Sequence, residues 1–256
     1  MLASLALLGG CRTARHKNVT AESLYTTAHK AMEGSDYQYA IKQYEELTAR
    51  FPFSNQARQA RLDLIYVYYR KGDKDSATDA ADEFLRENPT HPRVDYAWYM
   101  KGLVNFEKTP ISLERWLGVD MAKKPPTTAL TAITDFNTVV TRYPKSEYAH
   151  DAERRIIYLR NRLAEYEVYV ADYYVRRGAY IAAARRAQGV LTNYEGAPSE
   201  RRALLIMIDC YQRLGYKPQE DNARRVYEAN FAGTTDESAG TRKHWWQFWR
   251  PKADTT

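Results

Sequence analysis

The chain has 256 residues, 44% of them hydrophobic, and its 38 Lys and Arg against 32 Asp and Glu give a formal net charge of +6 at pH 7. Residues 12–17 carry +3 of this charge and residues 236–256 carry +1, so the middle is nearly neutral, which argues against a nucleic-acid-binding surface. Two cysteines are too few for a disulfide framework.

The N-terminus has the order of a bacterial lipoprotein signal. An apolar run at residues 2–8 is too short to span a bilayer and is followed directly by Gly9, Gly10 and Cys11. This order resembles a lipobox, in which the signal peptide, here residues 1–10, is removed and the new terminal cysteine is acylated. We therefore expect Cys11 to be a lipid anchor, because two or more acyl chains hold a protein on a membrane. Residues 11–21 would form the linker.

Residues 22–142 repeat a pattern that is typical of helix pairs. A small residue is followed by apolar residues four and seven positions later and by a proline twelve positions later. This happens at Ala40 and Pro52, at Ala77 and Pro89, and at Ala132 and Pro144. Alanine permits close packing of a second helix, and proline cannot continue a helix. We expect three repeats here, with an insertion at residues 107–126.

Residues 143–231 hold two further units. Gly178 and Gly215 mark the turns inside them, and Ala183 begins the same apolar pattern again. From residue 145 to residue 177 there is no glycine or proline, and apolar residues recur every three or four positions. This spacing predicts one helix of ~50 Å. Its apolar stripe also fits a coiled coil, but packing on neighbouring repeats is the simpler interpretation.

These units resemble the tetratricopeptide repeat. The predicted fold class is therefore all-α, a right-handed α-solenoid of about five such helix pairs. An extended solenoid surface usually binds another polypeptide. An enzyme is disfavoured, because no two of the five histidines have the spacing of a metal site and no phosphate loop or nucleophile elbow is present. We predict no metal, no cofactor and no catalytic residue.

Several stretches carry a more specific resemblance. They are residues 50–53 (Arg-Phe-Pro-Phe), 62–66 (Leu-Asp-Leu-Ile-Tyr), 88–92 (Asn-Pro-Thr-His-Pro), 117–120 (Leu-Gly-Val-Asp), 158–164 and 177–180. Over roughly residues 22–231 the chain resembles the BamD family, tetratricopeptide lipoproteins of the outer-membrane β-barrel assembly machinery. The resemblance implies a scaffold on the periplasmic face of the outer membrane. It also implies three kinds of protein partner: unfolded outer-membrane proteins, the central barrel subunit BamA, and possible small accessory lipoproteins.

The resemblance also implies two binding surfaces. In that family the N-terminal repeats are thought to meet the C-terminal signal of unfolded barrel proteins. On this chain the client-binding residues would be Tyr25, Phe53, Tyr66, Tyr69, Tyr96 and Tyr99, of which we expect half to fill the core between repeats. Arg186 matches a family interface arginine and is expected to dock the central subunit. The residues expected to share that surface are Asp172, Arg176 and Arg185.

The C-terminal segment, residues 232–256, departs from the family pattern. It contains Trp245, Trp246, Phe248 and Trp249, flanked by basic residues. This composition favours membrane headgroups or a hydrophobic groove on a partner. The alternative is a flexible tail without a function.

A second function fits the same elements. A tetratricopeptide lipoprotein for peptidoglycan, cell division or pilus assembly would share the lipobox and the repeats. It would lack the long helix and the insertion between Phe106 and Pro126. We therefore prefer barrel assembly.

Overall fold

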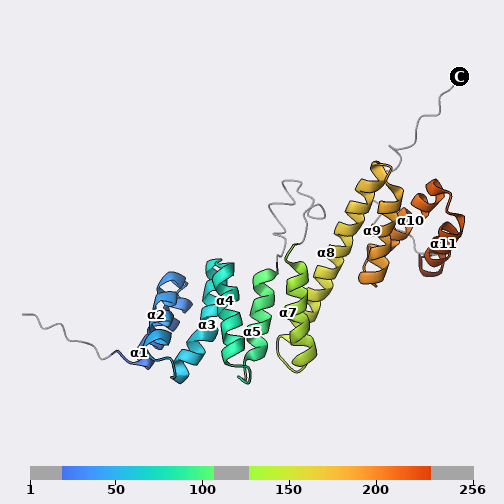
Figure 1. The fold of residues 1–256 in the computed structure, drawn as a ribbon. Coiled ribbons are helices and arrows are strands. Elements are labelled where there is room, and N and C mark those ends of the chain that lie inside the picture. The colour runs from blue at the N-terminus through green and yellow to red at the C-terminus, as the bar shows by residue number, and fades with distance from the viewer. Residues whose placement is uncertain (1–18, 107–126, 232–256) are drawn as a thin grey trace, which may run out of the picture. The chain divides into compact units, whose positions relative to one another are not determined.

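A computed structural model describes residues 19–106 and 127–231, and within these ranges the chain forms ten α-helices and no strand (Figure 1). They are α1 (Ala21–Glu33), α2 (Tyr37–Arg50), α3 (Asn55–Lys71), α4 (Lys74–Glu87), α5 (Val94–Asn105), α7 (Ala129–Arg142), α8 (Ala149–Arg176), α9 (Tyr180–Asn193), α10 (Glu200–Leu214) and α11 (Lys217–Phe231). The predicted all-α class is confirmed. Cys11, the insertion at 107–126 and the tryptophan-rich segment lie outside the described residues.

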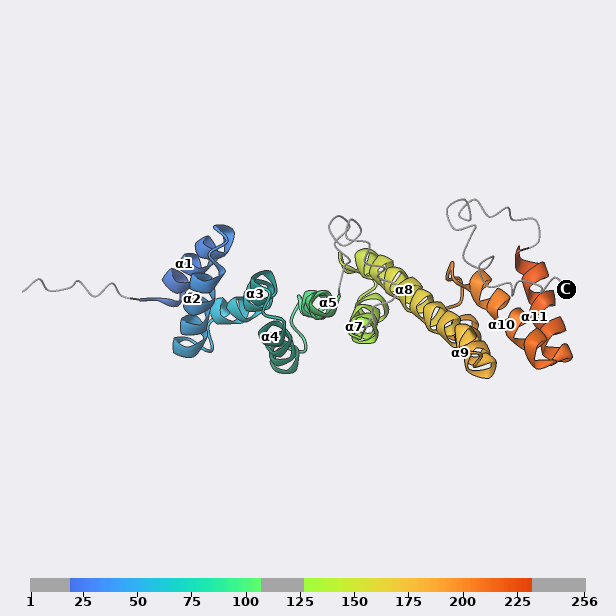
Figure 2. The ribbon, with the colours of Figure 1, turned by 90° about the horizontal axis from the view of Figure 1, so that it is seen from above.

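The helices belong to two compact units. The N-terminal unit contains α1 to α5, α7 and the first part of α8, up to Ile157. The C-terminal unit contains the rest of α8, from Tyr158, together with α9, α10 and α11. Within the N-terminal unit each helix packs on the next, from α1 to α7 (Figures 1 and 2). Within the C-terminal unit α10 packs on both α9 and α11.

The repeated pattern of small and apolar residues forms the core of the N-terminal unit. The alanines at the start of the pattern and the apolar residues four and seven positions later are all fully buried. They are Ala40, Tyr44, Leu47, Ala77, Ala81, Phe84, Ala132, Phe136 and Val139. Because alanine has only a methyl group, the backbones of paired helices approach closely there, and the larger side chains fill the space on either side. The pattern therefore encodes how the helices pair.

Each second helix ends in the same way. Phe51, Asn88 and Tyr143 are the C-caps of α2, α4 and α7, with φ between −131° and −128° and ψ between 53° and 55°. Each is followed by a proline, and the residue before a proline avoids the helical conformation. Tyr194 ends α9 with φ −129° although Glu195 follows it. The cap geometry of the repeat therefore does not depend on the proline alone.

The turns inside the helix pairs use left-handed residues. Gly72, Gly178 and Gly215 have φ of 85°, 72° and 71°, a conformation that costs glycine nothing. In the turn of the first pair the left-handed position is occupied by Ser35, with φ 62°, because the glycine is the residue before it, Gly34. A residue with a side chain is strained in this conformation, so the first turn carries a local cost that the glycine turns avoid.

The turns between successive pairs lie along one edge of the N-terminal unit. These are residues 51–54 between α2 and α3, residues 88–93 between α4 and α5, and residues 143–148 between α7 and α8. All three appear at the lower edge of this unit in Figure 1. We call this edge the turn edge.

Candidate protein-binding sites

The six predicted client-binding residues all lie in the N-terminal unit, and Phe53 is the most exposed of them. Its side chain is 96% exposed, in the turn between α2 and α3. The preceding Pro52 is held by a hydrogen bond from Arg61 to its carbonyl oxygen, at 3.3 Å. This turn thus presents to solvent an aromatic ring, a residue type that is enriched at protein interfaces.

Tyr25 is engaged in a polar contact between helices. Its hydroxyl donates to Asp63 Oδ2 at 3.0 Å, and the hydroxyl of the fully buried Tyr44 donates to the same atom at 3.2 Å. Gln59 donates to the other carboxylate oxygen at 2.8 Å. Burial raises the pKa of Asp63, and these three hydrogen bonds partly offset the effect. Tyr25 therefore joins α1 to α3, and its ring also stacks on His29.

Tyr66 and Tyr69 are half-buried on α3 and pack against the core formed with α4 and α5. Arg70 lies over the rings of Tyr66 and Tyr37, at 5.5 and 5.3 Å from the centroids. It also donates a hydrogen bond to the Tyr66 hydroxyl. Tyr66 and Tyr69 therefore each use part of the ring surface to pack within the unit. The ring surface that remains for a client is smaller than the sequence suggests.

Tyr96 and Tyr99 form a ladder of rings with Tyr148. The centroid of Tyr148 lies 5.5 Å from that of Tyr96 and 4.8 Å from that of Tyr99. We call these three rings the tyrosine ladder. The hydroxyl of Tyr99 donates to Asp151 at 2.6 Å, which ties α5 to the start of α8. Tyr148 was not among the residues predicted from the sequence.

The position of Tyr148 within its repeat could have predicted this contact from the sequence. It stands four residues after Pro144, as Arg93 stands four residues after Pro89. Arg93 Nη2 donates to the Tyr148 hydroxyl at 2.9 Å, and its guanidinium lies 4.9 Å from the Tyr96 ring centroid. Equivalent positions of adjacent repeats therefore touch each other on the turn edge.

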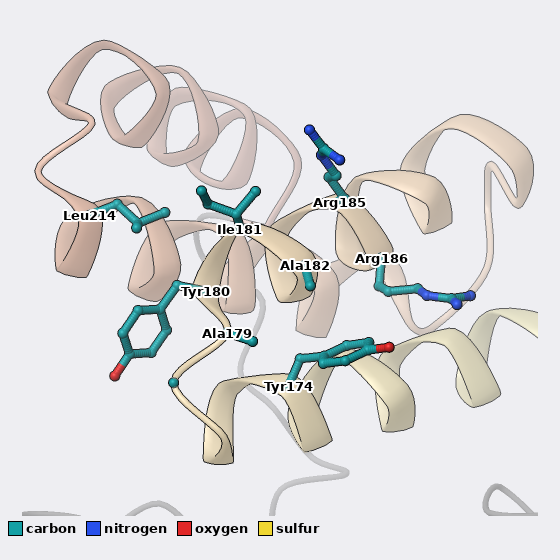
Figure 3. Close-up of a pocket in the computed structure, with 9 residues that line it drawn as sticks. Tyr174, Ala179, Tyr180, Ile181, Ala182, Arg185, Arg186 and Leu214 are labelled. Atoms are coloured by element: carbon teal, nitrogen blue, oxygen red, sulfur yellow. The ribbon is translucent and has the colours of Figure 1, made fainter.

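Two of the four predicted docking residues of the C-terminal unit, Arg185 and Arg186, line a pocket of about 690 Å³. It lies between the end of α8, the start of α9 and the end of α10, and Figure 3 shows the side chains around it. It is lined by Tyr174, Gly178, Ala179, Tyr180, Ile181, Ala182, Arg185, Arg186 and Leu214. An apolar lining with two arginines suits a partner segment that combines an apolar side chain with a carboxylate.

Arg186 is bound by a carboxylate of its own chain. Its Nη1 donates to both carboxylate oxygens of Glu167 on α8, at 3.0 and 3.2 Å. These hydrogen bonds raise the pKa of Arg186, so it stays protonated. Arg185, the preceding residue on α9, is exposed, and no ion pair joins it to a carboxylate within the described residues. Figure 3 shows the two arginines extending from α9 in different directions.

The other two predicted docking residues do not line the pocket. Asp172 accepts a hydrogen bond from Arg202 on α10 at 2.7 Å, and Arg176 lies 6.0 Å from the Tyr173 ring centroid. The first contact joins α8 to α10, and the second lies within α8. Tyr174, Tyr180, Ile181 and Leu214 line the pocket instead. Sequence periodicity alone could not select them, because a pocket between three helices depends on how they pack.

Metal binding and thiol chemistry find no support among the described residues. Across residues 19–106 and 127–231 no three His, Cys, Asp or Glu side chains gather as metal ligands. Cys210 is fully buried, and burial raises the pKa of its thiol to about 12, so it carries no reactive thiolate at neutral pH. None of the helices seen in these ranges combines the length and the apolar character that crossing a membrane requires.

Comparison with known proteins finds relatives along nearly the whole chain. A family model described as an outer membrane lipoprotein (YfiO) matches residues 17–226. The curated relatives include proteins named outer membrane protein assembly factor BamD. The protein of Neisseria meningitidis serogroup A is 38% identical over 233 residues, which cover 90% of this chain and 87% of that protein. Those of Vibrio cholerae serotype O1 and Xylella fastidiosa strain Temecula1 are each 35% identical over 90% of this chain, and 96% and 80% of their own lengths are covered.

Proposed function

The chain belongs to the outer membrane lipoprotein family that matches residues 17–226 and is related to curated BamD assembly factors, and on this premise we propose that it assembles outer-membrane proteins as a member of the BAM complex. The observation that carries the proposal is identity of 35–38% over 90% of the chain to relatives that all bear this name. Such similarity spans both compact units, so it concerns the whole scaffold.

The mechanism we propose is binding without catalysis. The N-terminal unit holds an unfolded client against Phe53 and the tyrosine ladder, where rings can pack on aromatic side chains of an extended segment. The C-terminal unit docks the periplasmic part of the central barrel subunit BamA at the pocket beside Arg186. One protein thereby brings a client close to the subunit that inserts it. In this mechanism the protein binds both partners and catalyses no reaction.

The membrane attachment we propose is lipid at Cys11. The thiol would carry acyl chains after removal of residues 1–10, holding the scaffold at the periplasmic face of the outer membrane. A Cys11→Ser variant should then move from the membrane fraction to the soluble periplasmic fraction. Retention of this variant on the membrane would contradict the anchor.

In this proposal the tryptophan-rich segment contacts the membrane or an assembly partner. Residues 241–256 contain Trp245, Trp246, Phe248 and Trp249 among basic residues, a combination that suits the headgroup region or a groove of a partner. Deletion of residues 241–256 should lower binding to liposomes or remove a component from the purified complex. Unchanged liposome binding together with an unchanged complex would show that the segment has neither role.

The experiment that tests the function is depletion of the protein from its host. The amount of folded outer-membrane barrels, measured by their heat-dependent mobility in gels, should fall as the protein is depleted. Plasmid-borne wild type should restore it. Normal barrel levels after complete depletion would contradict the proposal, and would favour the peptidoglycan or pilus alternative.

A further inference from the structure

We infer that one corner of the N-terminal unit, formed by the exposed residues Val19, Phe53 and Arg58, rests on a phospholipid bilayer that carries anionic headgroups. We call these three residues the anchor corner. The inference rests on the lipid anchor in the proposed function, because acyl chains at Cys11 would bring this corner to the membrane. It adds a protein surface that contacts the headgroups directly.

The start of α1 and the turn between α2 and α3 lie side by side. Glu22, in the first turn of α1, accepts a hydrogen bond from Gln56 Nε2 at 2.8 Å, and Gln56 lies in the first turn of α3. Val19 stands three residues before Glu22, and Phe53 stands three residues before Gln56. Two segments that are 34 residues apart in the sequence therefore meet at one end of the turn edge.

The chain between Cys11 and this corner is short. Val19 is eight residues after Cys11, and a fully extended chain of that length spans at most ~29 Å. An acylated Cys11 would therefore hold the anchor corner within about this distance of the headgroups. A surface tethered so closely meets the bilayer at a high effective concentration, so a contact of low intrinsic affinity is enough.

Two side chains of the anchor corner are apolar and exposed. The Phe53 side chain is 96% exposed and that of Val19 is 38% exposed. The turn that carries Phe53 is closed by Ser54, which donates to the carbonyl oxygen of Phe51 from its backbone N–H at 3.0 Å and from its hydroxyl at 2.8 Å. A ring that projects from such a turn can enter the boundary between headgroups and acyl chains, where it is removed from water.

The linker and the corner carry positive charge. Residues 12–21 contain two arginines, one lysine and no acid, and residues 50–62 contain three arginines and no acid. Two of these three arginines pair with Glu46 and Glu87 on neighbouring helical turns, whereas no ion pair joins Arg58 to a carboxylate within the described residues. Basic residues next to a membrane are attracted by anionic headgroups, so the charge favours the same surface as the apolar side chains do.

Arg58 is the base that a lipid phosphate can use. It is exposed in the first turn of α3, three residues from Gln56, and its guanidinium donates a hydrogen bond to the side-chain oxygen of Asn55. A guanidinium has five N–H donors, so further donors remain for a phosphate. Phosphate oxygens can accept two parallel hydrogen bonds from one guanidinium.

Phe53 then has two alternative ligands. Without a client its ring lies among the headgroups, and a client that packs on Phe53 takes the place of the lipid. The bilayer thereby covers an aromatic ring that is otherwise almost wholly exposed to water.

The test uses the full mature chain, acylated at Cys11 and reconstituted into phosphatidylcholine vesicles with or without phosphatidylglycerol. Phe53→Cys is labelled with nitrobenzoxadiazole, and quenching by spin-labelled lipid reports contact with the bilayer. Cys210 stays unlabelled, because it is fully buried and burial raises the pKa of its thiol to about 12. Tyr39→Cys is the matched control, since Tyr39 is 45% exposed near the start of α2, whereas Phe53 follows the end of this ~21 Å helix.

In vesicles with phosphatidylglycerol the label at position 53 should be quenched about threefold more than the label at position 39. Without phosphatidylglycerol this difference should shrink. Arg58→Gln should lower the equilibrium constant for the contact about fivefold, as expected for one basic residue at an anionic surface. Arg70→Gln, which changes an exposed arginine in the last turn of α3, should leave it unchanged. If Phe53→Cys fails to fold, as judged by its circular dichroism, Asn55→Cys carries the label instead.

The outcomes separate the inference from the proposed function. Equal quenching at positions 53 and 39 would overturn the inference and leave both the lipid anchor and barrel assembly intact. Equal quenching at position 53 with and without phosphatidylglycerol would also overturn it, because the corner would then not recognise anionic headgroups. If the protein stays on vesicles of neither composition, the lipid anchor of the proposed function is wrong together with the inference.

Discussion

Arg186 on α9 and Glu167 on α8 form a two-point ion pair beside the pocket of the C-terminal unit, with distances of 3.0 and 3.2 Å from Nη1 to the two carboxylate oxygens. The side chain of Arg186 is 47% exposed and that of Glu167 is 22% exposed. A partner that uses Arg186 must therefore share it with Glu167 or displace that carboxylate. The strength of docking depends on this competition.

Glu167→Gln should strengthen docking of the central subunit. Removing the carboxylate frees the Arg186 guanidinium, and an exposed pair of this kind contributes less than about 1 kcal/mol, so affinity should rise by up to about fivefold. Binding of the purified periplasmic domains of that subunit, followed by biolayer interferometry, measures the change. Glu165→Gln is the matched control, since Glu165 is exposed on the same helix. Weaker binding by Glu167→Gln would mean that the internal pair supports the docking geometry.

Ser35→Gly should stabilise the N-terminal unit. Ser35 is exposed and has φ 62°, so its side chain adds strain that glycine lacks. We expect a gain of about 0.5–1 kcal/mol in the free energy of unfolding, measured in urea. Gly72→Ala gives the reverse comparison, because its φ is 85° and no neighbouring atom would touch the new methyl group. A loss of stability in Ser35→Gly would contradict the strain assigned to this turn.

Gly102→Ala should destabilise the contact between α5 and α7. A Cβ at this position would stand 2.6 Å from a ring atom of Phe136, which is fully buried and has little room to move. The expected loss is about 1–3 kcal/mol. Gly189→Ala is the control, because its Cβ would meet nothing closer than 3.9 Å, and it should gain up to about 1 kcal/mol from helix propensity. Thermal unfolding of the two variants and the wild type measures both changes in stability.

Asp135 should make the stability depend on pH. It is 3% exposed, its Oδ1 lies 3.9 Å from Lys101 Nζ, and its Oδ2 has no hydrogen-bond partner in the described chain. Burial outweighs the attraction of Lys101 and raises the pKa of Asp135 to about 6. The folded state thus holds this proton more tightly than the unfolded chain does. The stabilisation is full below the unfolded pKa and is lost as the pH rises through about 6.

Wild type should therefore lose about 2 kcal/mol of unfolding free energy from this group between pH ~4 and pH ~7. Asp135→Asn should lose less over the same range, and the difference between the two proteins in urea isolates the contribution of Asp135. Asp79→Asn, which changes an exposed carboxylate on α4, should follow the wild type. Identical pH profiles for wild type and Asp135→Asn would contradict the assignment.

The fold could be predicted because its determinants are local. Each helix pair requires a small residue where its two helices pack closely and a residue that ends the second helix. Alanine and proline meet these requirements, and they recur in the sequence as Ala40, Ala77 and Ala132, each with a proline twelve positions later. The tyrosines could not be sorted in the same way. Tyr25 and Phe53 look alike as aromatic residues, yet one is hydrogen-bonded to Asp63 and the other is almost wholly exposed.

The contacts of the docking residues also could not be predicted from the sequence. Arg186 was found by resemblance and does line a pocket, but its partner Glu167 is 19 residues away on another helix and carries no sequence signal. Asp172, which was expected to share the surface, is paired with Arg202 on α10. Which carboxylate meets which arginine depends on how α8, α9 and α10 pack, and only the structure gives that arrangement.

Affinity purification of the intact protein from detergent-solubilised envelopes tests the central claim most directly. Wild type should bring down an outer-membrane barrel subunit with periplasmic domains, identified by mass spectrometry, and Arg186→Glu should lower its yield while Arg154→Glu, a charge reversal in the N-terminal unit, leaves it unchanged. Recovery of a cell-wall or pilus component in place of a barrel subunit would contradict a role in barrel assembly.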